Sequence, residues 1–431
     1  MRRLFALVFT IAASPLAAQD TSRVLDAPVR VGVDYQPGMR PKLAVVPGLG
    51  IDSLRAIVRR DLDFSDRFEM VDAGDPSRAS AGGSDGASGL NYGIYKLLGA
   101  QFAVELVEVP GGVRARLHNV SLSRVTNDQV VTLPASTDPA FRMSAHRLSD
   151  EITRWATSTP GAAATRLLFV SGGRVHQMDS DGAGLVPLSP AGVTALSPVW
   201  SADGQRIAYT RLENGRGAVV LQNLATGASQ NAAGAGSALN ITPAFSPDGR
   251  TLAYARSDET GTDIFSMNAA ENCCAQRLTV GRFADNLSPT FSPDGRRIAF
   301  VSTRAGPPQI YVMAANGTDQ ELLAPFDYGA TGSSNAPEWS PDGANVVFHR
   351  EVSRSPQLFL VDVASRRIRQ LSDAGRNEDP TWSPDGRHIA FISDRSGRRQ
   401  IWIIDIETGR VRQLSTPNAA RLPSWSRRLS R

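Results

Sequence analysis

A short motif early in the chain matches the surroundings of a nucleophilic serine. Gly82, Ser84 and Gly86 fit the pattern G-x-S-x-G, which presents the catalytic serine of many hydrolases. The pattern makes a serine reactive only where a strand leads into it and a helix follows, because that geometry forces the strained turn. Here the motif lies within residues 73–89, a stretch dominated by Gly, Ser, Ala and Asp that predicts a flexible loop. We therefore expect no catalytic serine there.

Histidine and cysteine, which supply many protein metal sites, are sparse in this chain. The histidines are His118, His146, His176, His349 and His388. None has H-x-x-x-H spacing or stands beside the cysteine pair, and two adjacent thiols alone cannot complete a tetrahedral site. Cys273 and Cys274 can form a vicinal disulfide in an oxidising compartment, although a surface turn without redox function is the simpler interpretation. The sequence predicts neither a metal nor a cofactor.

An aspartate followed by glycine recurs at regular intervals. The positions are Asp203, Asp248, Asp294, Asp342 and Asp385. Repeated carboxylates suggest acid catalysis or a metal site, but each one stands directly before a glycine. Asp-Gly is a strong turn signal because glycine readily adopts a positive φ. We interpret these aspartates as turn residues.

The turns belong to a longer phrase that organises most of the chain. Its middle copy runs from Pro289 to Gly295 and reads P-T-F-S-P-D-G. The leading prolines are Pro198, Pro243, Pro289, Pro337, Pro380 and Pro423, spaced 43 to 48 positions apart. A steady period in this range indicates a repeat architecture with one supersecondary unit per copy.

Each copy predicts one four-stranded antiparallel sheet. After the Asp-Gly turn, the runs 297–301, 309–313 and 321–323 are short, rich in β-branched and apolar residues, and bounded by turn residues. Such sheets repeated around an axis form a β-propeller. Residues 165–188 look like a unit without its opening strand, and 423–426 look like an opening strand without its unit. Joined, they complete a sixth blade and close the ring, which removes open sheet edges.

The chain before the repeats predicts a leader and a smaller domain. The first residues combine a basic start, an apolar run and small residues, as in a secretory signal peptide. Helix and strand patterns then predict a small α/β domain with a mixed sheet, in which Asp52 caps a helix. The expected organisation is a signal peptide (1–18), an extended segment (19–41), an α/β domain (42–158), a linker (159–164) and an all-β six-bladed propeller (165–431).

Charge and hydropathy exclude several function classes. The formal net charge is only +4, and no repeat carries a stripe of Lys and Arg interleaved with exposed aromatics. Nucleic-acid binding is therefore not expected. No long apolar segment follows the leader, so membrane insertion is not expected either. We predict an exported, soluble monomer.

The loops in which the repeats differ are the expected binding site. Each loop before a leading proline returns the chain to the axis, so its last residues should rim the central channel. Variable loops on a rigid scaffold commonly carry binding function, although an ordinary solvated loop is the alternative. The expected rim residues are Ser197, Asn240, Thr242, Asp285, Asn286, Ser288, Asn335, Glu378 and Asp379.

This order of parts resembles the TolB family, the periplasmic propeller proteins of the Tol–Pal system. The resemblance covers nearly the whole chain after the leader, and the N-terminal pattern makes it more specific than the repeats alone. The matching stretches are V-R-V at 29–31 with Asp34, G-M-R-P at 38–41, L-G-A at 98–100, and His146 with D-E at 150–151.

The resemblance implies a binding protein that catalyses no reaction. Its channel mouth would hold Pal, a peptidoglycan-associated lipoprotein, and its N-terminal segment would contact TolA, an inner-membrane protein. The residues implied for the TolA contact are Val29, Arg30, Val31, Val33 and Asp34. Such a protein supports outer-membrane integrity and invagination at cell division. The alternatives are an exported peptide- or carbohydrate-binding propeller without Tol partners and a propeller-type hydrolase or lyase.

Overall fold

The computed structural model describes residues 40–47, 50–72, 74, 90–232, 239–281, 284–326, 332–414 and 416–429. The expected signal peptide (1–18), the expected TolA-contacting residues (29–34) and the serine motif (82–86) lie outside the described residues. Within the described ranges, no helix combines the length and the apolar character needed to span a membrane.

A five-stranded mixed sheet forms the centre of the first domain. Its strand order is β2-β1-β3-β4-β5, with β1 parallel to both of its neighbours and the remaining pairs antiparallel. The strands are β1 (Lys42–Val45), β2 (Glu69–Val71), β3 (Phe102–Val109), β4 (Gly112–Asn119) and β5 (Arg124–Val131). The predicted small α/β domain with a mixed sheet is therefore confirmed.

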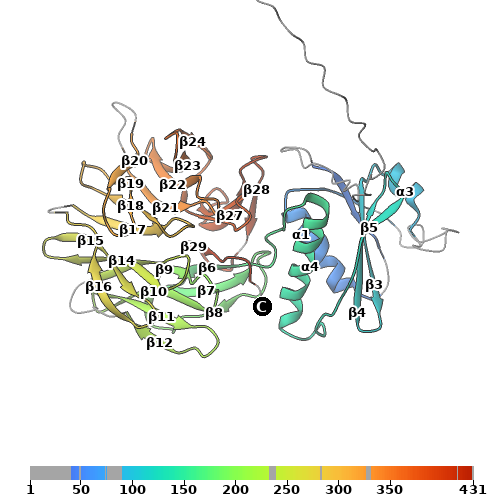
Figure 1. Cartoon of the computed structure of the whole chain (residues 1–431), viewed down its shortest axis with the longest axis horizontal. Helices are drawn as coiled ribbons and strands as arrows, with labels where there is room; N and C mark the ends of the chain where they lie inside the picture. The colour runs from blue at the N-terminus through green and yellow to red at the C-terminus, as the bar shows by residue number, and fades with distance from the viewer. Residues whose placement is uncertain are drawn as a thin grey trace, which may run out of the picture.

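Two long helices lie between this sheet and the propeller (Figure 1). They are α1 (Asp52–Phe64) and α4 (Ala140–Thr157), and both bury apolar residues against one face of the strands. The short helix α3 (Tyr92–Leu97) packs against the opposite face. One side of each long helix thus covers the sheet, which leaves the other side free to meet the propeller.

The apolar face of α1 follows the spacing seen in the sequence. The buried positions include Leu54, Ile57, Val58 and Leu62. The expected cap is wrong, however, because Ile51 occupies the N-cap position and no side chain of the described residues caps the helix. Asp52 instead lies in the first turn, where its carboxylate accepts a hydrogen bond from Arg55 at 3.0 Å.

Six four-stranded antiparallel sheets form the propeller, as the repeats predicted. Five of them consist of strands that are consecutive in the sequence. The first sheet consists of β9 (Thr194–Trp200), β10 (Arg206–Glu213), β11 (Arg216–Asn223) and β12 (Ser229–Asn231). The second consists of β13 (Leu239–Phe245), β14 (Thr251–Asp258), β15 (Gly261–Asn268) and β16 (Cys273–Arg277). The third consists of β17 (Asn286–Phe291), β18 (Arg297–Ser302), β19 (Gln309–Ala314) and β20 (Glu321–Ala324). The fourth sheet consists of β21 (Ser334–Trp339), β22 (Asn345–Val352), β23 (Ser355–Asp362) and β24 (Ile368–Gln370). The fifth consists of β25 (Asn377–Trp382), β26 (His388–Ser393), β27 (Gln400–Asp405) and β28 (Val411–Leu414).

The sixth sheet joins the two ends of the repeat region. Its order is β29-β6-β7-β8, from β29 (Arg421–Trp425), β6 (Arg166–Ser171), β7 (Arg174–Asp179) and β8 (Val186–Pro187). Trp425 pairs with Leu167 in this sheet and is buried in one cluster with Leu167 and Phe169. The predicted closure of a six-bladed ring by a C-terminal strand is confirmed.

The repeated Ser-Pro-Asp-Gly stretch forms the turn between the first two strands of a blade. In the third copy, the Gly295 amide donates to the Ser292 carbonyl at 2.8 Å, with Pro293 at the second turn position, as in a type I turn. The Asp294 carboxylate accepts from the Ser292 hydroxyl at 2.5 Å and from the Arg296 amide at 3.1 Å. Gly295 has a φ of +71°. The aspartate therefore holds the turn together.

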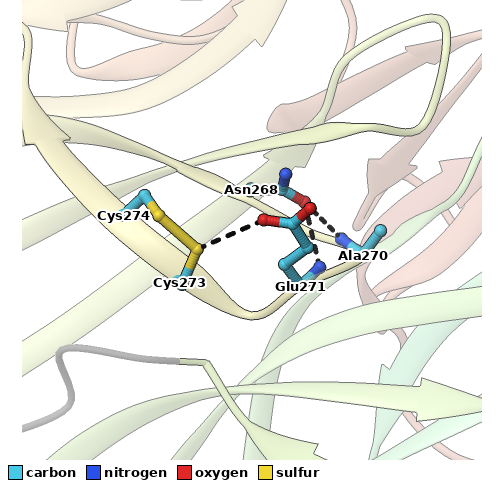
Figure 2. The surroundings of a disulfide bond; sticks show 5 residues. All are labelled: Asn268, Ala270, Glu271, Cys273 and Cys274. Carbon is cyan, nitrogen blue, oxygen red and sulfur yellow. Dashed lines mark hydrogen bonds between the residues drawn. A yellow bond between two sulfur atoms is a disulfide. The ribbon is translucent and has the colours of Figure 1, made fainter.

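The two cysteines are joined by a disulfide at the start of β16 (Figure 2). The carboxylate of Glu271 lies 3.6 Å from the sulfur of Cys273. This is a contact rather than a hydrogen bond, because a disulfide sulfur carries no hydrogen. The side chain of Asn268 accepts from the amides of Ala270 and Glu271, which fixes the preceding turn. The sulfur atoms are thus engaged with each other and do not act as thiolate ligands.

Buried charged side chains join the two domains. Asp66, which follows α1, lies 2.9 Å from Arg410 and 3.1 Å from Arg412 of the propeller. The His388 ring bridges the domains, with Nε2 3.1 Å from Asp66 and Nδ1 2.7 Å from Asp385. Burial opposes a charged His388 ring, but the Asp385 carboxylate outweighs this effect and raises the pKa of His388. Both carboxylates thus favour the protonated form of the His388 ring.

A second ionic contact connects α1 and α4 with the turn after β7. His146 of α4 is completely buried, and its Nδ1 lies 2.7 Å from the Asp61 carboxylate of α1. Asp181 of the turn accepts from Arg142 at 2.5 Å and from Arg60. Nε2 of His146 faces the Asp181 carboxylate at 3.8 Å. Both long helices thus contact the propeller through charged groups.

Candidate functional site

An open channel of about 720 Å³ lies along the propeller axis. Its wall consists of the inner strands β9, β13, β17, β21, β25 and β29, each of which contacts the inner strands of both neighbouring blades. Every inner strand contributes the residue before the repeat proline, the proline itself and the aromatic residue two positions later. Five of the six, all but β25, also contribute the position between the proline and the aromatic residue. The phrase that defines the repeat in the sequence is therefore also the channel wall.

One residue of each inner strand has a left-handed backbone. These residues directly precede the repeat proline, and the register of the inner strand slips beside them in every blade. Their φ angles lie between +48° and +52°. They are Ser197, Thr242, Ser288, Ala336, Asp379 and Leu422. This conformation costs a non-glycine residue about 1 kcal/mol, and such strain is concentrated at functional sites. Here it forms a ring at one end of the channel.

Four residues predicted from the sequence belong to this ring and line the channel. They are Ser197, Thr242, Ser288 and Asp379. Three of them are small hydroxyl residues, so half of the six-residue ring is polar and uncharged. We use the term channel mouth for this ring, and mouth face for the propeller face formed by the loops around it.

Three other predicted residues lie on the mouth face but outside the channel. Asp285 is exposed, and its amide donates to the Thr303 hydroxyl at 2.8 Å. Asn335 is half-buried. The carboxylate of Glu378 lies 3.1 Å from both Arg376 and Arg399. A partner would meet these residues beside the opening.

Two predicted rim residues are wrong, because their side chains lie in the interior of the propeller. Asn240 is 2% exposed and Asn286 is completely buried. The Asn286 amide donates to the Asp263 carboxylate of the preceding blade at 3.0 Å, and its oxygen accepts from Arg304 at 3.0 Å. The pairing register of β13 and β17 turns both side chains into the interior of the propeller. They can therefore contact neighbouring blades but not a partner protein.

A carboxylate that the sequence interpretation missed lies inside the channel. Glu338 occupies the variable position after the repeat proline, and it accepts hydrogen bonds from the Thr381 hydroxyl and the Trp382 amide, both at 3.1 Å. Burial raises the pKa of Glu338 to about 7. The sequence signal was available, since the corresponding positions in the other blades hold Val, Ala, Thr or Ser.

Asp379 is the acidic residue of the channel mouth. Its carboxylate accepts from the Leu422 amide at 3.3 Å, and its own amide donates to Nδ1 of His349 at 3.2 Å. Burial raises the pKa of Asp379 and lowers the pKa of His349. The accepted hydrogen bond requires a neutral Nδ1, which is consistent with the lowered pKa of His349.

The segment after β29 runs along the other end of the channel. Arg427 and Arg428 line the channel there. Arg428 donates to the Gly161 carbonyl at 2.7 Å, and the Leu429 amide donates to the Ala164 carbonyl at 3.1 Å. The same short segment therefore borders the channel and binds the linker between the domains.

The site has the features of a binding surface. All five histidines lie in the described part of the chain, and none of them is hydrogen-bonded to a serine. Activation of a serine nucleophile by histidine requires such a bond. What the channel does offer is a cavity of fixed shape with a polar mouth, two carboxylates of raised pKa and apolar walls of proline, phenylalanine and tryptophan.

Comparisons with known proteins agree with this architecture. A family model described as the TolB beta propeller domain matches residues 154–328 and 325–430, more than half of the chain. The Tol-Pal system protein TolB of Methylococcus capsulatus is 32% identical over 248 residues, which is 54% of this chain and 55% of that protein. The corresponding protein of Haemophilus influenzae strain Rd is 29% identical over 254 residues, with 53% and 55% covered. The chain thus spans about half the length of the curated relatives it matches.

A solved structure shows the same fold over nearly the whole chain. The crystal structure of TolB from Acinetobacter baumannii superposes with a TM-score of 0.77 at 24% sequence identity. The superposition covers 91% of this chain and 98% of that structure. The small α/β domain and the propeller therefore occur together in both.

Proposed function

Because the chain belongs to the TolB β-propeller family, we propose that it is a non-enzymatic binding component of a Tol–Pal system in the periplasm. It holds a Pal-like peptidoglycan-associated lipoprotein at the channel mouth and contacts a TolA-like inner-membrane protein through its N-terminal segment. In this role it supports outer-membrane integrity and invagination at cell division. The curated relatives, which are named as Tol-Pal system proteins, support the assignment to this system.

The observation that carries the proposal is the channel with its repeated mouth. The same backbone distortion occurs at the same position of all six inner strands, so the opening has a fixed shape. The ring residues are mostly small, and the cavity behind them is large enough for side chains of an inserted loop. A preformed, rigid opening loses little entropy when a partner enters it, which favours protein binding.

A pull-down from envelope extract tests the binding of the lipoprotein. The chain without residues 1–18 serves as bait, and captured proteins are identified by mass spectrometry. We expect enrichment of a Pal-like lipoprotein and a strong reduction with Thr290→Trp, because an indole at this channel-lining position obstructs the cavity.

Ala225→Trp is the matched control for this experiment. Ala225 is exposed in the turn between β11 and β12, on the face opposite the mouth. The Ala225→Trp bait should capture as much of the lipoprotein as the unmodified bait does. Failure of the unmodified bait to capture any lipoprotein, or equal capture by both tryptophan variants, would contradict binding at the channel.

The N-terminal segment is assigned to the second partner by the resemblance of residues 29–34 to the family pattern. Deletion of residues 19–35 should abolish capture of a TolA-like protein and preserve capture of the lipoprotein. The same extract and bait provide the measurement. Retention of the TolA-like protein by the shortened chain would show that the contact lies elsewhere.

A further inference from the structure

Exposed arginines gather on one half of the mouth face. This half comprises the blades β21–β24, β25–β28 and the shared blade of β29 and β6–β8. Its exposed arginines are Arg354, Arg376, Arg398 and Arg421. Among the described residues of these loops, Asp373 is the one exposed acidic residue. We call these four arginines the arginine sector.

The hydrogen bonds within the arginine sector orient it and leave most of its charge available. Arg376 donates to the carbonyl of Arg354 at 3.4 Å, and Arg398 donates to the Pro417 carbonyl at 3.3 Å. These partners are neutral. Glu378 is the charged partner of Arg376, but it also pairs with Arg399 and its side chain is only 18% exposed. One carboxylate is thus shared by two guanidinium groups, and a net positive charge remains.

The other half of the mouth face presents the opposite charge. Its exposed acidic residues are Glu213, Asp258, Glu259 and Asp285. Among the described residues around them, Arg216 and Arg304 are exposed at hairpin turns, and Arg277 at the outer edge is ion-paired with the buried Asp263. The four exposed carboxylates outnumber the two turn arginines, so this half keeps a net negative charge. Two sectors of opposite sign therefore flank one channel mouth.

We infer that the arginine sector contacts an acidic segment of the protein partner that occupies the channel. This inference rests on the proposed function and adds the charge and the orientation of the partner. Arginine suits the task because its planar guanidinium binds carboxylates in a bidentate manner. Complementary charges accelerate association, and two sectors of opposite sign disfavour a partner rotated by half a turn about the channel axis.

Titration with a soluble Pal-like domain tests the inference. The probe is the lipoprotein encoded by the same genome, produced without its lipid anchor. The mouth variant combines Arg354→Glu, Arg376→Glu and Arg398→Glu. We expect its dissociation constant to rise by roughly tenfold or more at 50 mM salt, and the difference from wild type to shrink at 500 mM salt because salt screens exposed charges.

The control variant combines Arg250→Glu, Arg296→Glu and Arg367→Glu. These arginines are also exposed, but they lie at turns on the opposite face of the propeller. The control has the same net charge as the mouth variant and should bind within about threefold of wild type, as expected for charges far from the contact. Thermal unfolding of both variants confirms that they are folded.

The possible outcomes separate the two proposals. If wild type does not bind the probe, the proposed function fails and the inference fails with it. If wild type binds and the mouth variant binds equally well, only the inference is overturned. The inference is also overturned if the mouth variant keeps the probe but loses binding to phosphatidylglycerol vesicles that wild type binds, because the sector then serves an anionic lipid surface.

Discussion

At the scale of single residues, the most informative group is the carboxylate of Glu338. It lies in the channel wall and accepts two hydrogen bonds, yet burial still raises its pKa to about 7. A carboxyl whose pKa is higher in the folded protein than in the unfolded chain stabilises the folded state only while it is protonated. Its contribution is complete below its unfolded pKa of about 4.3 and is lost as the pH rises through its folded pKa. At neutral pH the side chain therefore destabilises the propeller.

Glu338→Gln should stabilise the protein at alkaline pH. The amide oxygen of Gln can accept the same hydrogen bonds without a charge, so we expect a gain of about 1–3 kcal/mol at pH 8 and almost none at pH 4. Thermal unfolding at both pH values provides the measurement. Glu213→Gln, a change at an exposed carboxylate, serves as the control and should show no comparable pH dependence. A gain that is equal at both pH values would contradict this account.

At the scale of elements, strand β29 holds the ring together. The Trp425 ring packs against Leu167 and Phe169, and its Nε1 donates to the Thr165 hydroxyl at 2.8 Å. Its amide donates to the Thr381 hydroxyl of the neighbouring inner strand at 3.0 Å. One residue thus joins the closing strand to the rest of its own blade and to the preceding blade.

Trp425→Ala should destabilise the propeller by about 3–5 kcal/mol, because it leaves a large cavity and removes the indole hydrogen bond. Urea unfolding provides the free energy, and hydrogen exchange should show β6 among the most affected strands. Val352→Ala, at the exposed end of β22, should change the stability by less than about 0.5 kcal/mol. Comparable losses for the two variants would mean that closure contributes little.

The sequence predicted these elements well because their signals are local. The proline-to-glycine phrase fixes a strand and a turn within seven positions, as its copy from Pro289 shows. What fills the space between blades was harder to predict. Asn240 and Asn286 were expected at the rim, since polar residues in loops are usually exposed, but register turns them inward. Glu338 was overlooked because it stands inside the phrase rather than in a variable loop.

At the scale of the whole molecule, charged contacts between the two domains make the stability of the domain junction sensitive to pH. These contacts could not be predicted from the sequence, because Asp66 and His388 are far apart in the chain. His388 has a raised pKa, so its stabilising contribution is complete below about pH 6.5 and is lost as the pH rises through its folded pKa. Asp66 and Asp385 have lowered pKa values, so their contributions are present above about pH 4 and are lost on acidification.

Raising the pH from 6 to 9 should therefore loosen the domain junction. We expect faster proteolysis of the linker at residues 159–164 and a lower unfolding temperature at pH 9. His388→Gln removes the charged bridge between Asp66 and Asp385, and it should reduce stability at pH 6 by about 3 kcal/mol and flatten the pH dependence.

His176→Gln is the control for the junction. His176 stacks on Phe169 in the shared blade and contacts no carboxylate among the described residues, so its replacement should leave the charged contacts of the junction in place. If the stability of His388→Gln still falls steeply with rising pH, the group responsible would be His146, the other histidine of the junction.

The pairing of β29 with β6 also determines the order in which the propeller forms. Arg166 and Ser426, whose hydrogen bond joins these strands, are 260 positions apart, whereas each of the other five blades uses consecutive strands. Closing a longer loop loses more entropy, and contacts between distant positions form slowly. The local blades can therefore form early, and the shared blade is completed last. Until then Leu167 and Phe169 lie at an open sheet edge, so a refolding chain should pass through a stage that is vulnerable to proteases and to self-association.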